Sequence, residues 1–155
     1  NLLCYNKKMD KKTEILNKIR AIYDHNVFTH DCCGIEIRDI SYGSAKLVII
    51  VDKKKHINLN NSIHGGMTFT LMDNATGVAG ATMGKRVVTV STTATYLHTA
   101  NPGDNIEAEC NVLSVDGDKV NMEMFCRNLT TGELVGKATS CMLIIGTFPD
   151  IPEKW

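Results

Sequence analysis

The chain has 155 residues, and its 17 Lys and Arg balance its 17 Asp and Glu, so the formal net charge is zero. This length predicts one domain with a hydrophobic core of its own. The charge balance and the 6% aromatic content argue against a nucleic acid or an acidic membrane surface as partner.

The six cysteines form no C-x-x-C pair, which favours buried, reduced thiols in a cytoplasmic protein. Residues 1–8 lack the sustained apolar stretch of a signal peptide. We set these residues aside as an extension that precedes Met9.

The first predicted element is a short amphipathic helix over residues 10–25. Ile15, Ile19 and Ile22 recur at helical spacing, while Lys and Glu fill the opposite face. Two strand patterns follow, over residues 35–38 and 45–51. A polar, turn-prone segment then leads into the next helix, and Ser62 is the residue that we expect to cap it.

The stretch His64–Gly84 predicts one long helix at the centre of the protein. Its apolar residues recur at spacings of three and four, and its other faces carry mostly Gly, Ala and Thr, so the helix should be buried on nearly all sides. Before the final glycine its single charge is Asp73. A carboxylate in the middle of a buried helix is costly unless it is paired or used. Asp73 is therefore the first candidate functional residue.

Four antiparallel strands are predicted after this helix. Alternating side chains mark residues 85–99, 106–112 and 120–126, and the last strand covers 134–145. In the first of these strands we expect the inward face to carry Val88, Val90, Thr92 and Ala94.

The segment from residue 147 on is a tail with prolines, and the absence of repeats and linkers predicts a single domain over residues 1–155. A single buried helix needs a sheet curved around it. The predicted class is therefore α+β, with a curved antiparallel sheet around one long helix and a short N-terminal helix.

The triplet His64-Gly65-Gly66 opens the central helix. The first turn of a helix carries unpaired N–H groups and a partial positive charge, and glycine lets a ligand approach the backbone closely. This start is a candidate site for a carbonyl oxygen or an oxyanion; the alternative is that the glycines serve tight packing. His64 is either a proton-transfer residue or a residue that caps the helix and orients the loop.

Asp73 follows His64 by nine residues, which corresponds to about 13 Å along a helix. Asp73 therefore cannot act on a carbonyl held at Gly65 of its own chain. Two such helices packed antiparallel across a two-fold axis would bring them together and form two equivalent composite sites. Asp73 would then be a general base toward water or a nucleophile toward an acyl carbon. The alternative is a buried Asp hydrogen-bonded to a neighbouring Thr or Asn.

The segment Asn58–Ala75, with the sequence NLNNSIHGGMTFTLMDNA, resembles the PaaI-like acyl-CoA thioesterases of the hotdog-fold superfamily. The similarity continues through Thr95–Glu109, which has a Tyr-containing strand and a Pro-Gly-Asp turn, and through the final hairpin at Asn128–Ile144. It covers about residues 35–145. The resemblance implies the hotdog fold, in which the curved sheet wraps around the central helix.

The resemblance also implies roles for individual residues. The acidic catalytic residue of the family falls on Asp73, and the backbone N–H that polarises the thioester carbonyl falls on Gly65, next to His64. A side-chain amide near that carbonyl falls on Asn58. A Ser or Thr that helps to hold the attacking water in some members falls on Thr89.

Gly66 and Asn58 are the residues expected to contact the substrate. The main departure from the family pattern is Asn61, where many members have Gly. Asn tolerates a positive φ better than most residues, so we expect the loop to keep its shape.

The resemblance implies an acyl-CoA substrate, homodimers that usually assemble as dimers of dimers, and CoA as part of the substrate rather than a cofactor. No spacing of ligand residues suggests a metal. Two alternatives stay open: a hydratase or dehydratase acting on acyl thioesters, and a non-catalytic acyl-CoA-binding protein. The identity of the acyl group depends on pocket shape and is not predicted.

Overall fold

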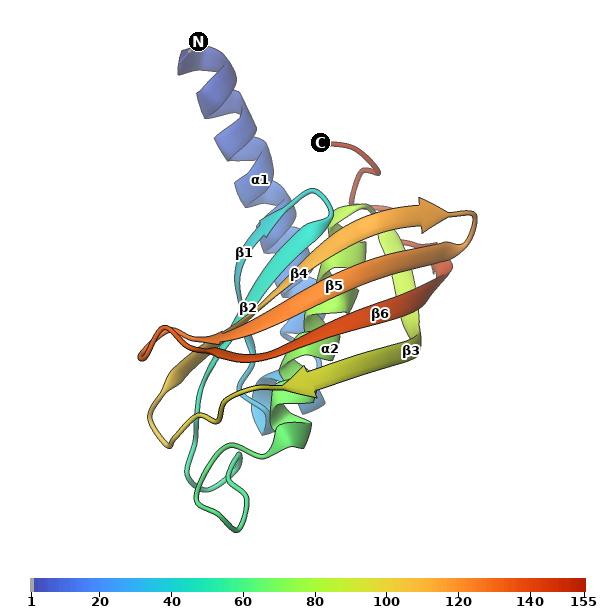
Figure 1. Ribbon diagram of the computed structural model, residues 1–155. Coiled ribbons are helices and arrows are strands. Elements are labelled where there is room, and N and C mark those ends of the chain that lie inside the picture. The colour runs from blue at the N-terminus through green and yellow to red at the C-terminus, as the bar shows by residue number, and fades with distance from the viewer. Residues whose placement is uncertain (1) are drawn as a thin grey trace.

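The computed structural model describes the backbone of residues 2–155 and the side chains of residues 10–155. In chain order the elements are α1 (Leu2–Tyr23), a π-helical turn η1 (Phe28–Cys32), β1 (Glu36–Ser41), β2 (Ser44–Ile50), α2 (Gly65–Thr82), β3 (Lys85–Tyr96), β4 (Asn105–Asp116), β5 (Lys119–Asn128) and β6 (Leu134–Thr147). The strands form one six-stranded antiparallel sheet in the order β1-β2-β4-β5-β6-β3. The sheet curves around α2 (Figure 1), which confirms the predicted α+β hotdog fold.

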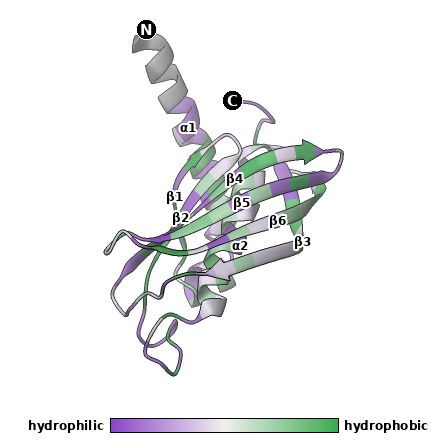
Figure 2. Ribbon diagram, viewed as in Figure 1, coloured by the Kyte–Doolittle hydropathy of each residue, from purple (hydrophilic) through white to green (hydrophobic). Residues whose placement is uncertain are grey.

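The core lies between α2 and the concave face of the sheet. On α2, Leu71, Met72, Ala75, Val78 and Ala79 are all fully buried. They meet alternate side chains of the strands, and Figure 2 shows apolar and polar segments following one another along those strands. This period-two alternation is what allows one face of an antiparallel sheet to be buried.

Helix α1 packs against the domain through its C-terminal half. Ile15 and Ile19 are fully buried, as their spacing predicts, and the Arg20 guanidinium donates a 2.8 Å hydrogen bond to the carbonyl of Ile37. The prediction that the helix starts at residue 10 is wrong, because α1 begins at Leu2 and its first turns extend beyond the sheet (Figure 1). Helical propensity continues through the apolar and charged residues before Met9, and no residue there ends the helix.

A β-bulge in β3 corrects the predicted alternation of that strand. The pairing with β6 shifts register between Thr89 and Ser91, so Val90 is an extra residue. Val88 and Val90 are 42% and 61% exposed, against the expectation that they face the core. Val87 packs on the core instead. One inserted residue reverses which side chains face inward, so the alternation changes phase at Val90.

The two ends of α2 are closed by groups that lie outside the helix. At the start, His64 is the cap rather than Ser62. At the end, Gly84 adopts a φ of +70°, and the Trp155 indole N–H donates a 2.6 Å hydrogen bond to the carbonyl of Thr82. The C-terminal tail therefore folds back over the end of α2, where Ile151 is buried.

No helix in the described part of the chain is both long enough and apolar enough to cross a membrane. The cysteines whose side chains are described are all free, and three of them are buried. Burial raises the pKa of Cys110 and of Cys126 to about 12, so both remain protonated thiols at neutral pH. Cys4 lies outside the described side chains.

The contact between Gly80 and Val87 generates a stability prediction. A Cβ at Gly80 would lie 2.8 Å from Val87 Cγ2. Overpacking by Gly80→Ala should lower the free energy of unfolding by about 1–3 kcal/mol. The better helix propensity of Ala, worth about 1 kcal/mol, offsets part of this loss. Urea unfolding measures the change, and adding Val87→Ala should remove part of the loss.

Gly146→Ala is the matched control, because the nearest atom to its Cβ would be Arg86 Cδ at 3.8 Å. Equal stability of Gly80→Ala and the control would show that this close approach of α2 and β3 does not constrain the fold.

Candidate active site

The start of α2 presents one backbone donor that the protein leaves unused. His64 has φ −67° and ψ 131°, and its Nδ1 accepts a 3.0 Å hydrogen bond from the N–H of Gly66. His64 therefore caps the helix, and the N–H of Gly66 is already used in this bond. Within residues 2–155, the N–H of Gly65 has no acceptor, so it points outward at the positive end of the helix.

Asn58 organises the loop that leads into this helix. Its side-chain Oδ1 accepts hydrogen bonds from the N–H of Asn60 at 2.8 Å and from the N–H and hydroxyl of Ser62 at 3.3 and 3.2 Å. Its Nδ2 donates to the carbonyl of Ile63 at 3.3 Å. One amide hydrogen of Asn58 remains available to a ligand.

The backbone of this loop is fixed by two further features. Asn61 has a φ of +57°, which confirms that Asn occupies the left-handed conformation here. His56 is buried, and its carbonyl accepts a 2.7 Å hydrogen bond from the N–H of His64. Its Nδ1 accepts a 2.9 Å hydrogen bond from the N–H of Asp52. These bonds anchor the residue that caps α2.

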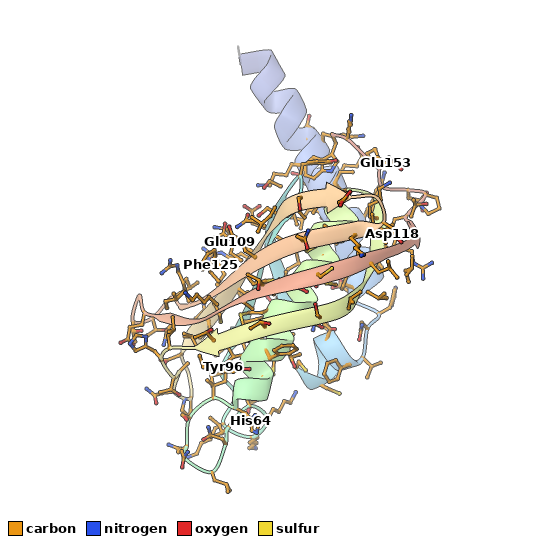
Figure 3. All side chains as sticks on the ribbon, turned by 45° about the vertical axis from the view of Figure 1, so that its right-hand side comes forward. His64, Tyr96, Glu109, Asp118, Phe125 and Glu153 are labelled. Carbon is orange, nitrogen blue, oxygen red and sulfur yellow. The ribbon has the colours of Figure 1, made fainter. Side chains whose placement is uncertain are left out.

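A cavity of about 300 Å³ opens beside Gly65, and its lining includes Asn58, Thr68 and residues 96–99. The ring of Tyr96 would be 3.6 Å from a Cβ at Gly65, and Figure 3 shows Tyr96 and His64 near the first turn of α2. Tyr96 is not among the site residues predicted from the sequence. Tyr96 lies at the end of β3, and the fold brings this end of the strand next to Gly65.

Asp73 and Thr89 form the second group of candidate residues. The Thr89 hydroxyl donates a 2.8 Å hydrogen bond to Asp73 Oδ1, so the structure brings together two residues that the resemblance had paired. The bulge at Val90 allows this contact, because it lets Thr89 face α2 while Thr92 keeps its inward position further along β3. The contact also fits the alternative of an Asp held by a neighbouring Thr.

A second cavity of about 280 Å³ adjoins Asp73. The residues that line it come from four elements, and they are Tyr23, Asp73, Asn74, Thr76, Gly77, Val87, Val88, Thr89 and Met142. The cavity thus combines one carboxylate with an apolar side wall. Within the described part of the chain, no three His, Cys, Asp or Glu side chains gather as metal ligands would.

One chain does not bring the two groups together. Asn58, His64 and Gly65 lie at the start of α2, while Asp73 lies eight residues beyond Gly65, which is about 12 Å along the helix axis. The two cavities share none of their lining residues. Within one chain, the unused N–H of Gly65 and the Asp73 carboxylate therefore lie in two separate places.

Comparison with known proteins gives consistent matches. Residues 60–135 match the model of the thioesterase superfamily. The structure is similar to the Escherichia coli PaaI protein of the phenylacetic acid degradation operon, with a TM-score of 0.81, 22% identity, and coverage of 88% of this chain and 97% of that one.

A hypothetical thioesterase from Streptococcus pneumoniae, solved with coenzyme A, has a TM-score of 0.69 and 25% identity, with coverage of 73% of this chain and 90% of that one. A relative from Archaeoglobus fulgidus, provisionally named an esterase, is 26% identical over 118 residues, which is 76% of either chain.

The fold and these matches indicate a thioester hydrolase of the hotdog class. The matched stretch, residues 60–135, is just under half of the chain and is similar to the thioesterase superfamily, and the fold as a whole is similar to that of the PaaI protein.

Proposed function

We propose that this protein hydrolyses acyl-CoA thioesters to a free carboxylic acid and CoA, at composite sites across a homodimer interface. The observation that carries the proposal is the separation on each chain of an unused N–H at Gly65 from the Asp73–Thr89 pair. Coenzyme A bound to the Streptococcus pneumoniae protein supports CoA as the carrier of the acyl group.

The exposed edge of the sheet supports a dimer. Strand β3 is the last strand of the sheet, and Val88 and Val90 are exposed there. An unpaired edge with exposed apolar side chains invites a second chain. A two-fold axis next to β3 would set two α2 helices antiparallel and bring Gly65 of one chain near Asp73 of the other. Further assembly into a dimer of dimers is part of the proposal.

The reaction follows from the two halves. The thioester oxygen accepts a hydrogen bond from the Gly65 N–H, assisted by the helix dipole and by the free amide hydrogen of Asn58. Asp73 from the second chain either takes a proton from a water that then adds to the acyl carbon, or attacks that carbon itself to give a mixed anhydride that water hydrolyses. The C–S bond breaks, and the proton supplied by water completes the CoA thiol.

Thr89 and His64 support this reaction without exchanging protons in it. Thr89 donates to Asp73 Oδ1, so its oxygen lone pairs can hold the attacking water. His64 fixes the helix start through Gly66. Variants of the Streptococcus pneumoniae thioesterase were solved with Ala replacing an Asp and a Thr that are sixteen residues apart, which is the separation of Asp73 and Thr89.

Asp73→Asn is the first test of the carboxylate. The Asn side chain keeps an oxygen acceptor for the Thr89 hydroxyl, so the fold should be preserved while the base or nucleophile is lost. We expect kcat to fall about 100-fold or more. Thiol release from a panel of short-chain, long-chain, phenylacetyl and benzoyl CoA esters measures it, with a blank for the protein's own cysteines.

Wild-type turnover in Asp73→Asn would overturn the role of Asp73. Analysis of the products separates the other activities: a hydratase leaves the thioester intact, and a binding protein holds acyl-CoA without turnover.

Gly65→Pro tests the backbone donor alone. Gly65 is the first residue of α2, where proline fits the helix and removes only an N–H that has no partner there. We expect kcat/KM to fall about 100- to 1000-fold. Gly65→Ala is the matched control, because it keeps the N–H and its Cβ would make an ordinary 3.6 Å contact with Tyr96. Equal activities of the two variants would contradict the role of this donor.

Mixing the two inactive variants tests the composite site. When Asp73→Asn and Gly65→Pro chains are unfolded together and refolded, half of the dimers contain both, and each mixed dimer has one intact site. We therefore expect about a quarter of the wild-type activity. Activity no higher than that of the separate variants, with mixed dimers verified by mass, would show that each site lies within one chain.

A further inference from the structure

The last residue of α1 fills a gap on α2 that a glycine leaves. A Cβ at Gly77 would lie 2.7 Å from the hydroxyl oxygen of Tyr23, a distance at which one of the two would have to move. The hydroxyl end of Tyr23 therefore lies against the bare backbone of α2 at Gly77. The fold brings this contact about, since Tyr23 and Gly77 are far apart in the sequence.

Tyr23 is held in this position from both sides. On α1, Arg20 is bonded to the carbonyl of Ile37 in β1 at 2.8 Å. After α1, the buried Thr29 of η1 donates a 2.8 Å hydrogen bond to Asn74 Oδ1, and Asn74 Nδ2 donates to the carbonyl of Thr70 at 2.8 Å. The end of α1 and the turn after it are thus fastened to α2 next to Asp73.

Tyr23 lines the same cavity as Asp73. Gly77 lies one helical turn beyond Asp73 on the same face, which is about 6 Å along the axis. The 280 Å³ cavity is lined by Asp73 and Thr89 and, beside Gly77, by Tyr23. Val87 and Met142 complete its apolar wall.

The hydroxyl of Tyr23 has no hydrogen-bond partner among residues 10–155. Burial raises the pKa of Tyr23 to about 12, so the hydroxyl stays neutral at physiological pH. Tyr23 therefore presents an uncharged aromatic side chain to the cavity.

We propose that Tyr23 is the end wall of the acyl pocket and limits the substrate to acyl groups no longer than one ring or a short alkyl chain. The inference rests on the proposed function, because it places the acyl carbon at Asp73 and lets the acyl group extend from there toward Gly77. A cavity of about 150 Å³ is enough to hold benzene. The 280 Å³ cavity thus has room for one such group in front of Tyr23.

Graded replacement of Tyr23 tests the wall. Tyr23→Leu and Tyr23→Ala open the cavity by increasing amounts, and Tyr23→Phe keeps the ring. For straight-chain acyl-CoAs longer than the wild-type optimum, we expect kcat/KM to rise about fourfold for each methylene that the enlarged pocket accepts. The gain should be larger for Ala than for Leu, and Phe should keep the wild-type profile. Tyr42→Ala, which removes an exposed tyrosine that does not line the cavity, is the matched control.

A binding series separates this inference from the proposed hydrolysis. S-alkyl-CoA thioethers from ethyl to decyl have no bond to hydrolyse, and calorimetry gives their Kd for each variant. A shift of the preferred length in Tyr23→Leu and Tyr23→Ala, without turnover of any acyl-CoA, would support the wall and overturn the hydrolase. Hydrolysis with an unchanged length profile in both variants would overturn the wall alone. Absence of both binding and turnover in the folded wild-type protein would overturn both.

Discussion

The close approach of β3 to α2 is the constraint on which the rest of the structure depends. Gly80 has no side chain where Val87 packs, so strand and helix meet at a distance that any larger residue would increase. The same approach, further along the strand, brings the Thr89 hydroxyl to 2.8 Å from Asp73. The bulge at Val90 is then necessary, because without it the strand could not place both Thr89 and Thr92 toward the helix. The contact between β3 and α2 thus both packs the core and holds Thr89 beside Asp73.

The rigid spacing of a helix keeps the two groups of candidate residues apart within one chain. The start of α2 offers an N–H donor, and its middle offers a carboxylate, but about 12 Å of helix separates Gly65 from Asp73. A flexible loop could bend to bring two such groups together, whereas a buried helix cannot. In the proposed dimer, a second copy of the same helix, run in the opposite direction, would supply the missing half at each end. The proposed dimer follows from this geometry.

Features that depend on local pattern could be predicted from the sequence, and features that depend on contacts between distant segments could not. The alternation of the strands and the periodicity of α2 predicted the curved sheet around a helix. The bulge was missed because Val90 is as apolar as its neighbours, so composition does not mark it. The cap was assigned to Ser62 because serine is a common cap, while the structure shows that His64 caps α2 through Nδ1. The roles of Tyr23 and Tyr96 required the folded chain.

The fold separates the groups proposed for chemistry from those proposed for substrate choice. Asp73, Thr89 and Gly65 belong to α2 and β3, which approach each other closely at Gly80 and Val87. Tyr23 belongs to α1, which meets α2 at the bare backbone of Gly77 and is held by the Arg20 and Thr29 hydrogen bonds as well as by the buried Ile15 and Ile19. A substitution at the end of α1 can therefore alter the depth of the cavity without moving the carboxylate or the backbone donor. On this structure, the length of the acyl group is set by an element that the reaction itself does not need.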